Sequence, residues 1–180
     1  MPQRRVSRRK CDAPEPPGVA RDPAGIVGVL ADAGVEVILI GGLAAQAHGS
    51  ARLTQDADFV YGRSNDNVAR LAAALAPFSV YLRGAPPGLP FRFDPPTIRR
   101  GLNFTLTTSI GDADFLGEIV GGGTYEQLLP HTIELVVFGK KVSVLDLPAL
   151  IKAKRAAGRP KDLEAVAELE ALLVERDRGG

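Results

Sequence analysis

The 180-residue chain has the size of one domain, and its 45% hydrophobic and 24% charged residues are ordinary for a globular protein with a substantial core. No stretch approaches the roughly 18 apolar residues of a membrane helix, and no apolar segment follows the basic N-terminus as in a signal peptide. The single Cys11 excludes an internal disulfide. We therefore expect a cytoplasmic protein that has no membrane segment.

The formal net charge of +1 combines two unlike parts. Residues 1–10 carry five basic residues and no acid, whereas the rest of the chain has a net charge of −4. Proline, glycine and charge dominate as far as residue 20, so we predict a disordered basic tail (1–20) and one domain (21–180). The tail has two interpretations: contact with nucleic-acid phosphates, or a solvated extension, which we favour.

Periodicity and turn residues predict the elements of the domain. In chain order we expect a helix over 22–34, a buried strand over 35–40, a helical segment over 43–49, a strand over 54–61, a helix over 64–78, a long exposed loop over 83–101, a hairpin over 102–120, a second pair of strands over 133–146, and two closing helices over 147–158 and 160–176. This order predicts an α/β (α+β) fold, with a small mixed β-sheet flanked by helices and two C-terminal helices.

Two acids in the second predicted strand carry the first functional signal. Asp56 and Asp58 alternate with Ala57 and Phe59, so both carboxylates lie on one face of the strand. Neighbouring carboxylates repel each other, and burying them unpaired is costly, which favours a divalent cation between them. Oxygen ligands with no nearby Cys suit Mg²⁺ or Mn²⁺, with phosphate oxygens completing the coordination.

Gly41 and Gly42 stand between the buried strand and the following helical segment. Glycines at such a junction let the backbone approach a ligand closely, and a helix N-terminus attracts anions. A phosphate cradle followed by a metal-binding acid pair is the minimal equipment for phosphoryl or nucleotidyl transfer from an NTP.

The stretch over residues 40–60, IGGLAAQAHGSARLTQDADFV, resembles the motif of the DNA polymerase beta-type nucleotidyltransferase superfamily. With Arg52 and Thr54 included, it resembles minimal bacterial nucleotidyltransferases, among them toxins of the abortive-infection AbiE type. The resemblance implies a nucleotidyltransferase fold with a third acid on a neighbouring strand. Asp114, between two hydrophobic residues, fits that position best, and Asp112, on the same face beside the turn, is the reserve candidate.

The resemblance extends over residues 24–175. The segment LIKAKRAAGRPKDLEAVAEL, residues 150–169, is similar to a Lys–Arg–Lys-Asp element that follows the core sheet in these proteins. It implies that Lys154, Arg159 and Lys161 face the triphosphate. Asp162 would then orient one of these neighbours or cap the last helix.

Other polar residues have open interpretations. Arg52 could contact a phosphate or pair with Asp56, and Thr54 could support the metal site or simply favour a strand. His48 could contact nucleotide or be a packing or surface residue, which we favour, and His131 is assigned a structural role. Four arginines bracket the predicted long loop, where they could receive an acceptor substrate or form a solvated charge cluster, which we favour: Arg83, Arg92, Arg99 and Arg100.

The pattern as a whole predicts a metal-dependent nucleotidyltransferase that moves an NMP from an NTP to an acceptor hydroxyl. The resemblance implies RNA or tRNA, protein or a small molecule as the acceptor, and a toxin role that would require an antitoxin partner. The alternative is a catalytically degenerate nucleotide-binding or interaction module of the same fold. A third hypothesis is a nucleic-acid-binding protein that uses the basic tail.

Overall fold

The computed structural model describes residues 22–179, so the predicted tail lies outside the described part of the chain. A seven-stranded mixed sheet has the order β3-β4-β5-β2-β1-β9-β8, and a two-stranded sheet pairs β6 with β7. The helices are α1 (Pro23–Asp32), α2 (Gly41–Ala47), α3 (Asn65–Leu75), α4 (Pro95–Arg100), α5 (Tyr125–Leu128), α6 (Leu147–Ala157) and α7 (Pro160–Gly179). The strands are β1 (Val37–Ile40), β2 (Asp56–Tyr61), β3 (Tyr81–Leu82), β4 (Asn103–Thr108), β5 (Gly111–Leu116), β6 (Glu118–Ile119), β7 (Gly123–Thr124), β8 (Thr132–Val137) and β9 (Lys140–Leu145).

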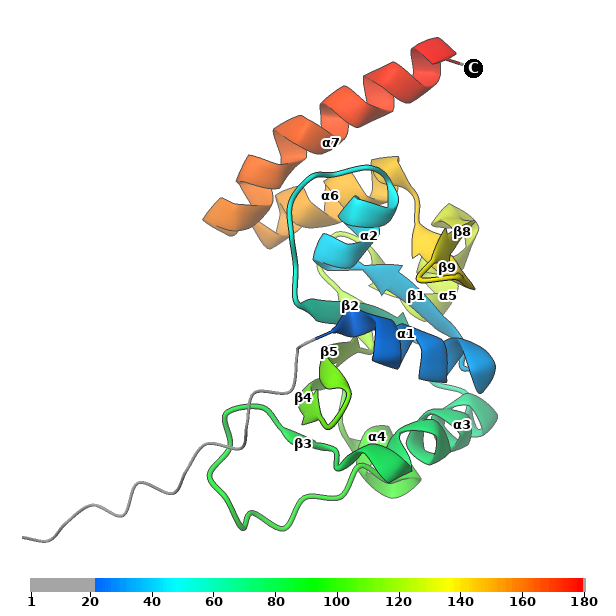
Figure 1. Ribbon diagram of the computed structural model, residues 1–180, viewed down its shortest axis with the longest axis vertical. Helices are drawn as coiled ribbons and strands as arrows, with labels where there is room; N and C mark the ends of the chain where they lie inside the picture. Colours follow the sequence, from blue (N-terminus) through cyan, green and yellow to red (C-terminus); the bar gives the residue numbers. More distant parts are fainter. Residues whose placement is uncertain (1–21, 180) are drawn as a thin grey trace, which may run out of the picture.

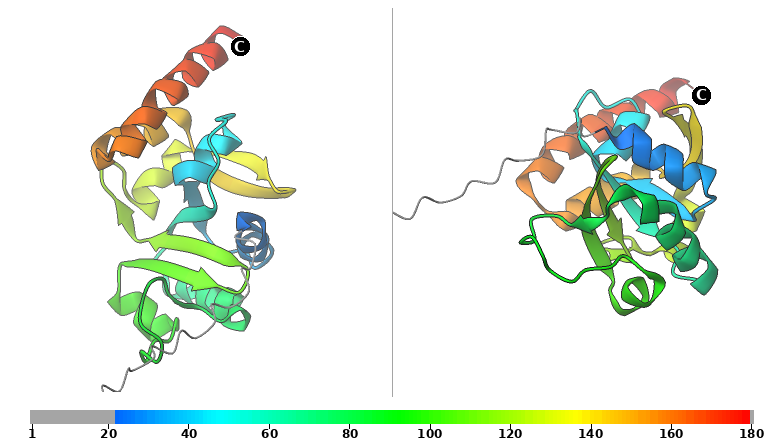
Figure 2. Two further views of the ribbon diagram at one scale, coloured as in Figure 1. Left: turned by 60° about the vertical axis from the view of Figure 1, so that its left-hand side comes forward. Right: turned by 60° about the horizontal axis from the view of Figure 1, so that its bottom comes forward.

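This is the predicted α+β architecture, with a mixed sheet, flanking helices and two closing helices. α1 crosses the sheet and contacts β2, β5 and β9, and it lies in front of the sheet in Figure 1. α3 and α4 pack on each other at one end of the molecule, and α6 and α7 pack on each other at the opposite end. α7 projects beyond the rest of the described chain (Figure 2). Within residues 22–179, no helix combines the length and the apolar character that crossing a membrane requires.

The centre of the sheet is the part that matters for the candidate site. β2 runs antiparallel to β1 and parallel to β5. Its apolar face is fully buried, with Phe59 stacked on Phe115 of β5 at 5.5 Å between ring centroids. The opposite face carries the acids. The stacked rings therefore anchor two strands whose other faces present carboxylates to the same side.

Local signals explain where the predicted helices begin and end. The side chain of Asp22 accepts a hydrogen bond from the backbone N–H of Ala24, and Ser64 accepts one from Asn67, as N-caps do. α6 ends at Gly158, which has a φ of +65°.

The prediction of one long exposed loop over 83–101 is wrong in part. Two residues before it form β3, on the outer side of β4, and its last residues form α4. Asp94 caps α4 by accepting a hydrogen bond from Thr97 N–H at 2.9 Å, and two prolines open the helix. A two-residue strand has no periodicity to recognise, whereas the Asp-Pro-Pro start signal was present in the sequence.

Other short elements also differ from the prediction. β7 and α5 were not expected, because they span only two to four residues each, and the second strand of the predicted hairpin over 102–120 divides into β5 and β6. β2 begins at Asp56 instead of residue 54.

Candidate metal centre

Strand register brings three carboxylates together on one face of the sheet. Asp58 lies opposite Ile40 of β1 and opposite Asp114 of β5. One carboxylate oxygen from each of Asp56, Asp58 and Asp114 lies within 4.8 Å of the others. Asp112 pairs with Asp56 in the register but lies outside this group, and it is buried, with 4% exposure. We call Asp56, Asp58 and Asp114 the carboxylate triad.

The two glycines make room for the triad. Gly41 follows β1 directly and has a φ of +68°, and a Cβ placed on it would lie 2.8 Å from Cγ of Asp58. A Cβ on Gly42 would lie 2.9 Å from Cβ of Thr54. Both distances are shorter than van der Waals contact allows, so the close approach of α2 to the acids requires glycine at both positions. α2 itself has only seven residues.

Thr54 positions Asp56. Its hydroxyl donates a hydrogen bond of 2.8 Å to Oδ1 of Asp56, which favours the interpretation that Thr54 supports the acid site. Burial would raise the pKa of Asp56, but the Thr54 hydrogen bond, a backbone hydrogen bond and the Arg83 charge outweigh it. The pKa of Asp56 therefore lies below its usual value, so this acid is ionised at neutral pH.

The other two acids of the triad behave differently. Burial, followed by the charges of Asp56 and Asp114, raises the pKa of Asp58 to about 6, although Lys161 and Arg159 oppose the rise. Burial also raises the pKa of Asp114. Asp58 and Asp114 thus ionise less readily than free aspartates, and a dication would stabilise the ionised triad because it would offset the repulsion among the three carboxylates.

The positive charge facing the triad comes from the basic turn, by which we mean Lys154 near the end of α6, Arg159 between the helices and Lys161 at the start of α7. Asp162 is buried, with a side-chain exposure of 5%, and it holds two cations: Nζ of Lys154 at 3.3 Å and Nε of Arg159 at 2.5 Å. Burial would raise the pKa of Asp162, but these two hydrogen bonds outweigh it and lower the pKa. Asp162 therefore orients neighbouring basic side chains, which is one of the two roles expected for it. Lys161 is exposed beside it.

Two cavities meet at the triad. One, of about 280 Å³, has polar walls and is lined by the glycines, the triad and the basic residues of the α6–α7 turn. The other, of about 330 Å³, is mostly apolar and lies between β5, β6 and α6, with Asn103 and Glu118 among its polar lining residues. Asp58, Asp114 and Lys154 line both. The predicted site residues Gly41, Gly42, Arg52, Thr54, Arg159 and Lys161 all line the polar cavity.

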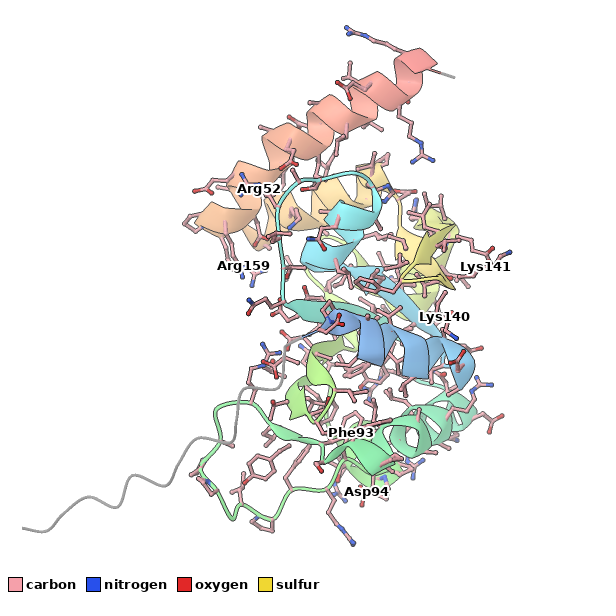
Figure 3. All side chains as sticks on the ribbon, in the orientation of Figure 1. Arg52, Phe93, Asp94, Lys140, Lys141 and Arg159 are labelled. Atoms are coloured by element: carbon pink, nitrogen blue, oxygen red, sulfur yellow. The ribbon has the colours of Figure 1, made fainter. Side chains whose placement is uncertain are left out.

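Arg52 does not pair with Asp56. Its Nε lies 3.1 Å from Oε2 of Glu168, and its Nη2 donates to the backbone oxygen of Glu164 at 3.2 Å, both on α7. The loop before β2 is therefore fastened to α7. Figure 3 shows Arg52 beside α7, above Arg159 at the α6–α7 turn.

Arg83 is the residue of the site that the sequence analysis did not assign. Its guanidinium donates a hydrogen bond to Asp114 and lies 3.4 Å from Oδ2 of Asp56 and 3.9 Å from Oδ2 of Asp112. In the sequence it was only one of four arginines around a loop, because nothing local indicates that a two-residue strand precedes it. Arg92 and Arg100, by contrast, lie near Asp94.

His48 has the structural role that was expected. Its Nε2 lies 2.8 Å from the backbone oxygen of Leu145, which ties α2 to β9.

Comparison with known proteins adds no assignment to this geometry. No protein-family model matches the chain, and a search of curated proteins also finds no match. The description of the protein that fold and site support is therefore an α+β domain with a three-carboxylate centre facing a basic turn.

Proposed function

We propose that the protein is a metal-dependent nucleotidyltransferase that moves an NMP from an NTP to an acceptor hydroxyl. The observation that carries this proposal is the clustering of the carboxylate triad within 4.8 Å at the wall of a polar cavity that also contains Lys154, Arg159 and Lys161. The carboxylate oxygens match the positive charge of the metal, and the neighbouring basic side chains match the negative charge of the triphosphate.

The donor set fits Mg²⁺ or Mn²⁺. Three carboxylates offer hard oxygen ligands, and the backbone of Gly41 leaves the space beside Asp58 free of a side chain. A bound Mg²⁺ or Mn²⁺ ion would supply charge stabilisation for the triphosphate and the attacking oxygen. In this arrangement Asp56, Asp58 and Asp114 hold the metal.

The basic turn binds the substrate's phosphates. Asp162 orients Lys154 and Arg159 from behind, so neither cation has to be ordered when the triphosphate arrives. Lys161 is exposed at the cavity and adds charge without a fixed partner in the described residues. Gly41 and Gly42 let the backbone come close to the phosphates.

Asp114 is suited to take the acceptor's proton, because burial raises its pKa. The acceptor oxygen then forms a bond to the α-phosphorus while the bond from that phosphorus to the pyrophosphate oxygen breaks. The proton passes to the Asp114 carboxylate, and pyrophosphate leaves with the bonding electrons. The motif resemblance supports this chemistry and extends the acceptor classes to RNA or tRNA, proteins and small molecules.

The test uses the purified full-length chain with each α-labelled NTP, Mg²⁺ or Mn²⁺, and total cellular RNA. Label on RNA or on the protein itself, lost in Asp58→Asn and retained in the matched surface variant Asp177→Asn, supports the proposal and identifies the acceptor class. An acceptor panel containing small hydroxyl compounds covers the remaining class. Absence of transfer to every acceptor, although NTP binds, rejects the proposal.

One observation favours the second candidate, a nucleotide-binding module without turnover. Arg83 already neutralises part of the triad through Asp56 and Asp114, which is compatible with a site that holds no metal. This candidate predicts NTP binding that does not depend on a divalent cation and is followed by no transfer. Equilibrium binding of a labelled NTP with and without EDTA distinguishes the two candidates.

A further inference from the structure

Arg83 and two acids of the triad lie in one row across the sheet. The backbone N–H of Arg83 donates to the oxygen of Thr105 at 3.0 Å, which continues the register in which Leu82 faces Leu106. Thr105 in turn lies opposite Asp114, and Asp114 lies opposite Asp58. Directly opposed residues point to the same face of a sheet, so Arg83 is directed along this row toward the triad.

The guanidinium of Arg83 uses the carboxylates that a metal ion would use. It contacts Asp114 and Asp56, two of the three acids of the triad, and its side chain is 28% exposed. A guanidinium on these carboxylates opposes the binding of a dication, because it occupies some of their lone pairs and the two positive charges repel at this separation.

The contact is incomplete as a permanent structural ion pair. Nε of Arg83 is buried and makes no hydrogen bond to the described residues. Asp58 forms no salt bridge with any cation within residues 22–179. A partly exposed ion pair with an unsatisfied donor is less stabilising than a fully bonded one, so the guanidinium can be displaced from this position.

Displacing the guanidinium from the triad requires movement of the Arg83 side chain alone. The loop that follows Arg83 is anchored, since Tyr81 donates its hydroxyl to the backbone oxygen of Pro86 at 2.7 Å and accepts from Leu89 N–H at 2.9 Å. Phe93, which Figure 3 labels next to Asp94 at the end of this loop, packs edge-to-face on Phe104 at 5.4 Å. Rotation about the side-chain bonds of Arg83 therefore suffices to open the site, without moving the loop.

We propose that Arg83 is a built-in counter-cation that closes the carboxylate triad in the absence of nucleotide, competes with the divalent metal, and transfers to the polyphosphate when the metal–nucleotide complex enters. The proposal rests on the proposed function for its last step only. The guanidinium is suited to that step because it binds phosphate oxygens in the same bidentate way as carboxylates. The metal site thus has low affinity for free metal and is completed by the substrate.

The test measures Mn²⁺ binding to the nucleotide-free full chain, monitored through the electron paramagnetic resonance signal of free Mn²⁺. Arg83→Gln removes the competing charge but keeps a donor for Asp114. The matched control is Arg70→Gln, which removes an equal charge from an arginine that pairs with Glu36 away from the triad. We expect at least a tenfold lower Kd for Mn²⁺ in Arg83→Gln than in the wild-type chain or in Arg70→Gln.

Two further variants keep the result decisive. In the double variant Arg83→Gln/Asp58→Asn, the gain in Mn²⁺ affinity must disappear. Arg83→Lys keeps the charge but loses the bidentate group, so its Kd for Mn²⁺ should lie between those of the wild-type chain and Arg83→Gln. If Arg83→Gln is unstable without metal, the rise of its Tm with Mn²⁺ replaces the binding signal and must exceed that of the wild-type chain. Unchanged or weaker Mn²⁺ binding in Arg83→Gln overturns the proposal, as does a gain that survives Asp58→Asn.

The outcome separates this proposal from the proposed function. If the wild-type chain transfers nucleotide but Arg83→Gln binds Mn²⁺ with unchanged affinity, the counter-cation proposal is rejected and the proposed enzymatic function stands. If Arg83→Gln binds Mn²⁺ more tightly but neither the wild-type chain nor any variant transfers nucleotide, the proposed enzymatic function is rejected and Arg83 remains a counter-cation of the triad.

Discussion

At Gly41 the chain leaves β1 with a φ of +68° and passes directly over the Asp58 carboxylate. Both the backbone angle and the missing side chain are needed there, since an L-residue resists the left-handed region and a Cβ would overlap Asp58. The same junction is where the resemblance to nucleotidyltransferases begins. The glycine is thus explained by packing against an acid, independently of any phosphate.

The substitution Gly41→Ala should destabilise the fold by at least about 2 kcal/mol through backbone strain and overlap, and should weaken Mn²⁺ binding at least tenfold because Asp58 is displaced. The matched control is Gly28→Ala, in the middle of α1, where a Cβ meets no heavy atom within 4 Å. That change should stabilise the protein by up to about 1 kcal/mol. Urea unfolding and Mn²⁺ titration of both variants check the pair, and equal behaviour of the two would contradict the packing argument.

Asp58 makes the stability of the metal-free protein depend on pH. Its pKa is about 6 in the fold against an ordinary value of 3.8, so the fold favours the protonated form. The contribution of this group to the free energy of unfolding is therefore fully present below pH 3.8 and is lost as the pH rises through 6.

We expect Asp58→Asn to remove this dependence, and to be more stable than the wild-type chain at pH 8 by at most about 3 kcal/mol in the absence of metal. With Mn²⁺ present, the wild-type chain should be the more stable of the two, because the ion binds its ionised carboxylate. Thermal unfolding between pH 4 and pH 8, with EDTA or with Mn²⁺, measures both effects. Parallel pH profiles for the two proteins in EDTA would show that Asp58 does not titrate in this range.

At the scale of elements, the α6–α7 turn acts as one unit. Gly158 ends α6 in the left-handed conformation, and α7 begins two residues later at Pro160. Asp162, in the first turn of α7, reaches back to Lys154 of α6 and to Arg159 of the turn. The buried acid thereby links α7 to α6 and fixes the position of the two cations that face the triad.

Asp162→Asn should cost about 3 kcal/mol of folding stability, because it leaves two cations without their buried partner. It should also weaken NTP binding, since Lys154 and Arg159 lose their fixed positions. Glu170→Gln on the same helix breaks an ion pair to Arg155 that is largely solvent-exposed, so a change below about 1 kcal/mol is expected. Urea unfolding and fluorescent-nucleotide titration compare the two, and an Asp162→Asn variant as stable as Glu170→Gln would show that the pair is not structural.

At the scale of the whole molecule, the strand order assembles the site from distant parts of the chain. β2 lies between β1, which precedes it, and β5, which follows some fifty residues later, with Asp56 facing Asp112 in register. β3 and β4 extend the sheet on the β5 side and carry Arg83 to the triad. One hydrophobic core cluster joins α1, the sheet and the closing helices. The site thus lies where the sheet meets the C-terminal pair of helices.

The sequence predicted well those features that depend on neighbouring residues. The N-caps Asp22 and Ser64 and the two β-hairpins are where local patterns indicated them. Alternation also predicted that Asp56 and Asp58 share a face. The partner of Arg52 was not predictable, because Glu168 is 116 residues away in the chain.

By itself, the sequence determined the order and kind of most elements and the shared face of the two acids, because alternation and capping are local properties. Only the tertiary structure decided that Asp114, and not Asp112, joins the triad, and that Arg83 lies against it. Both follow from strand register and strand order, which are set by packing between segments far apart in the chain.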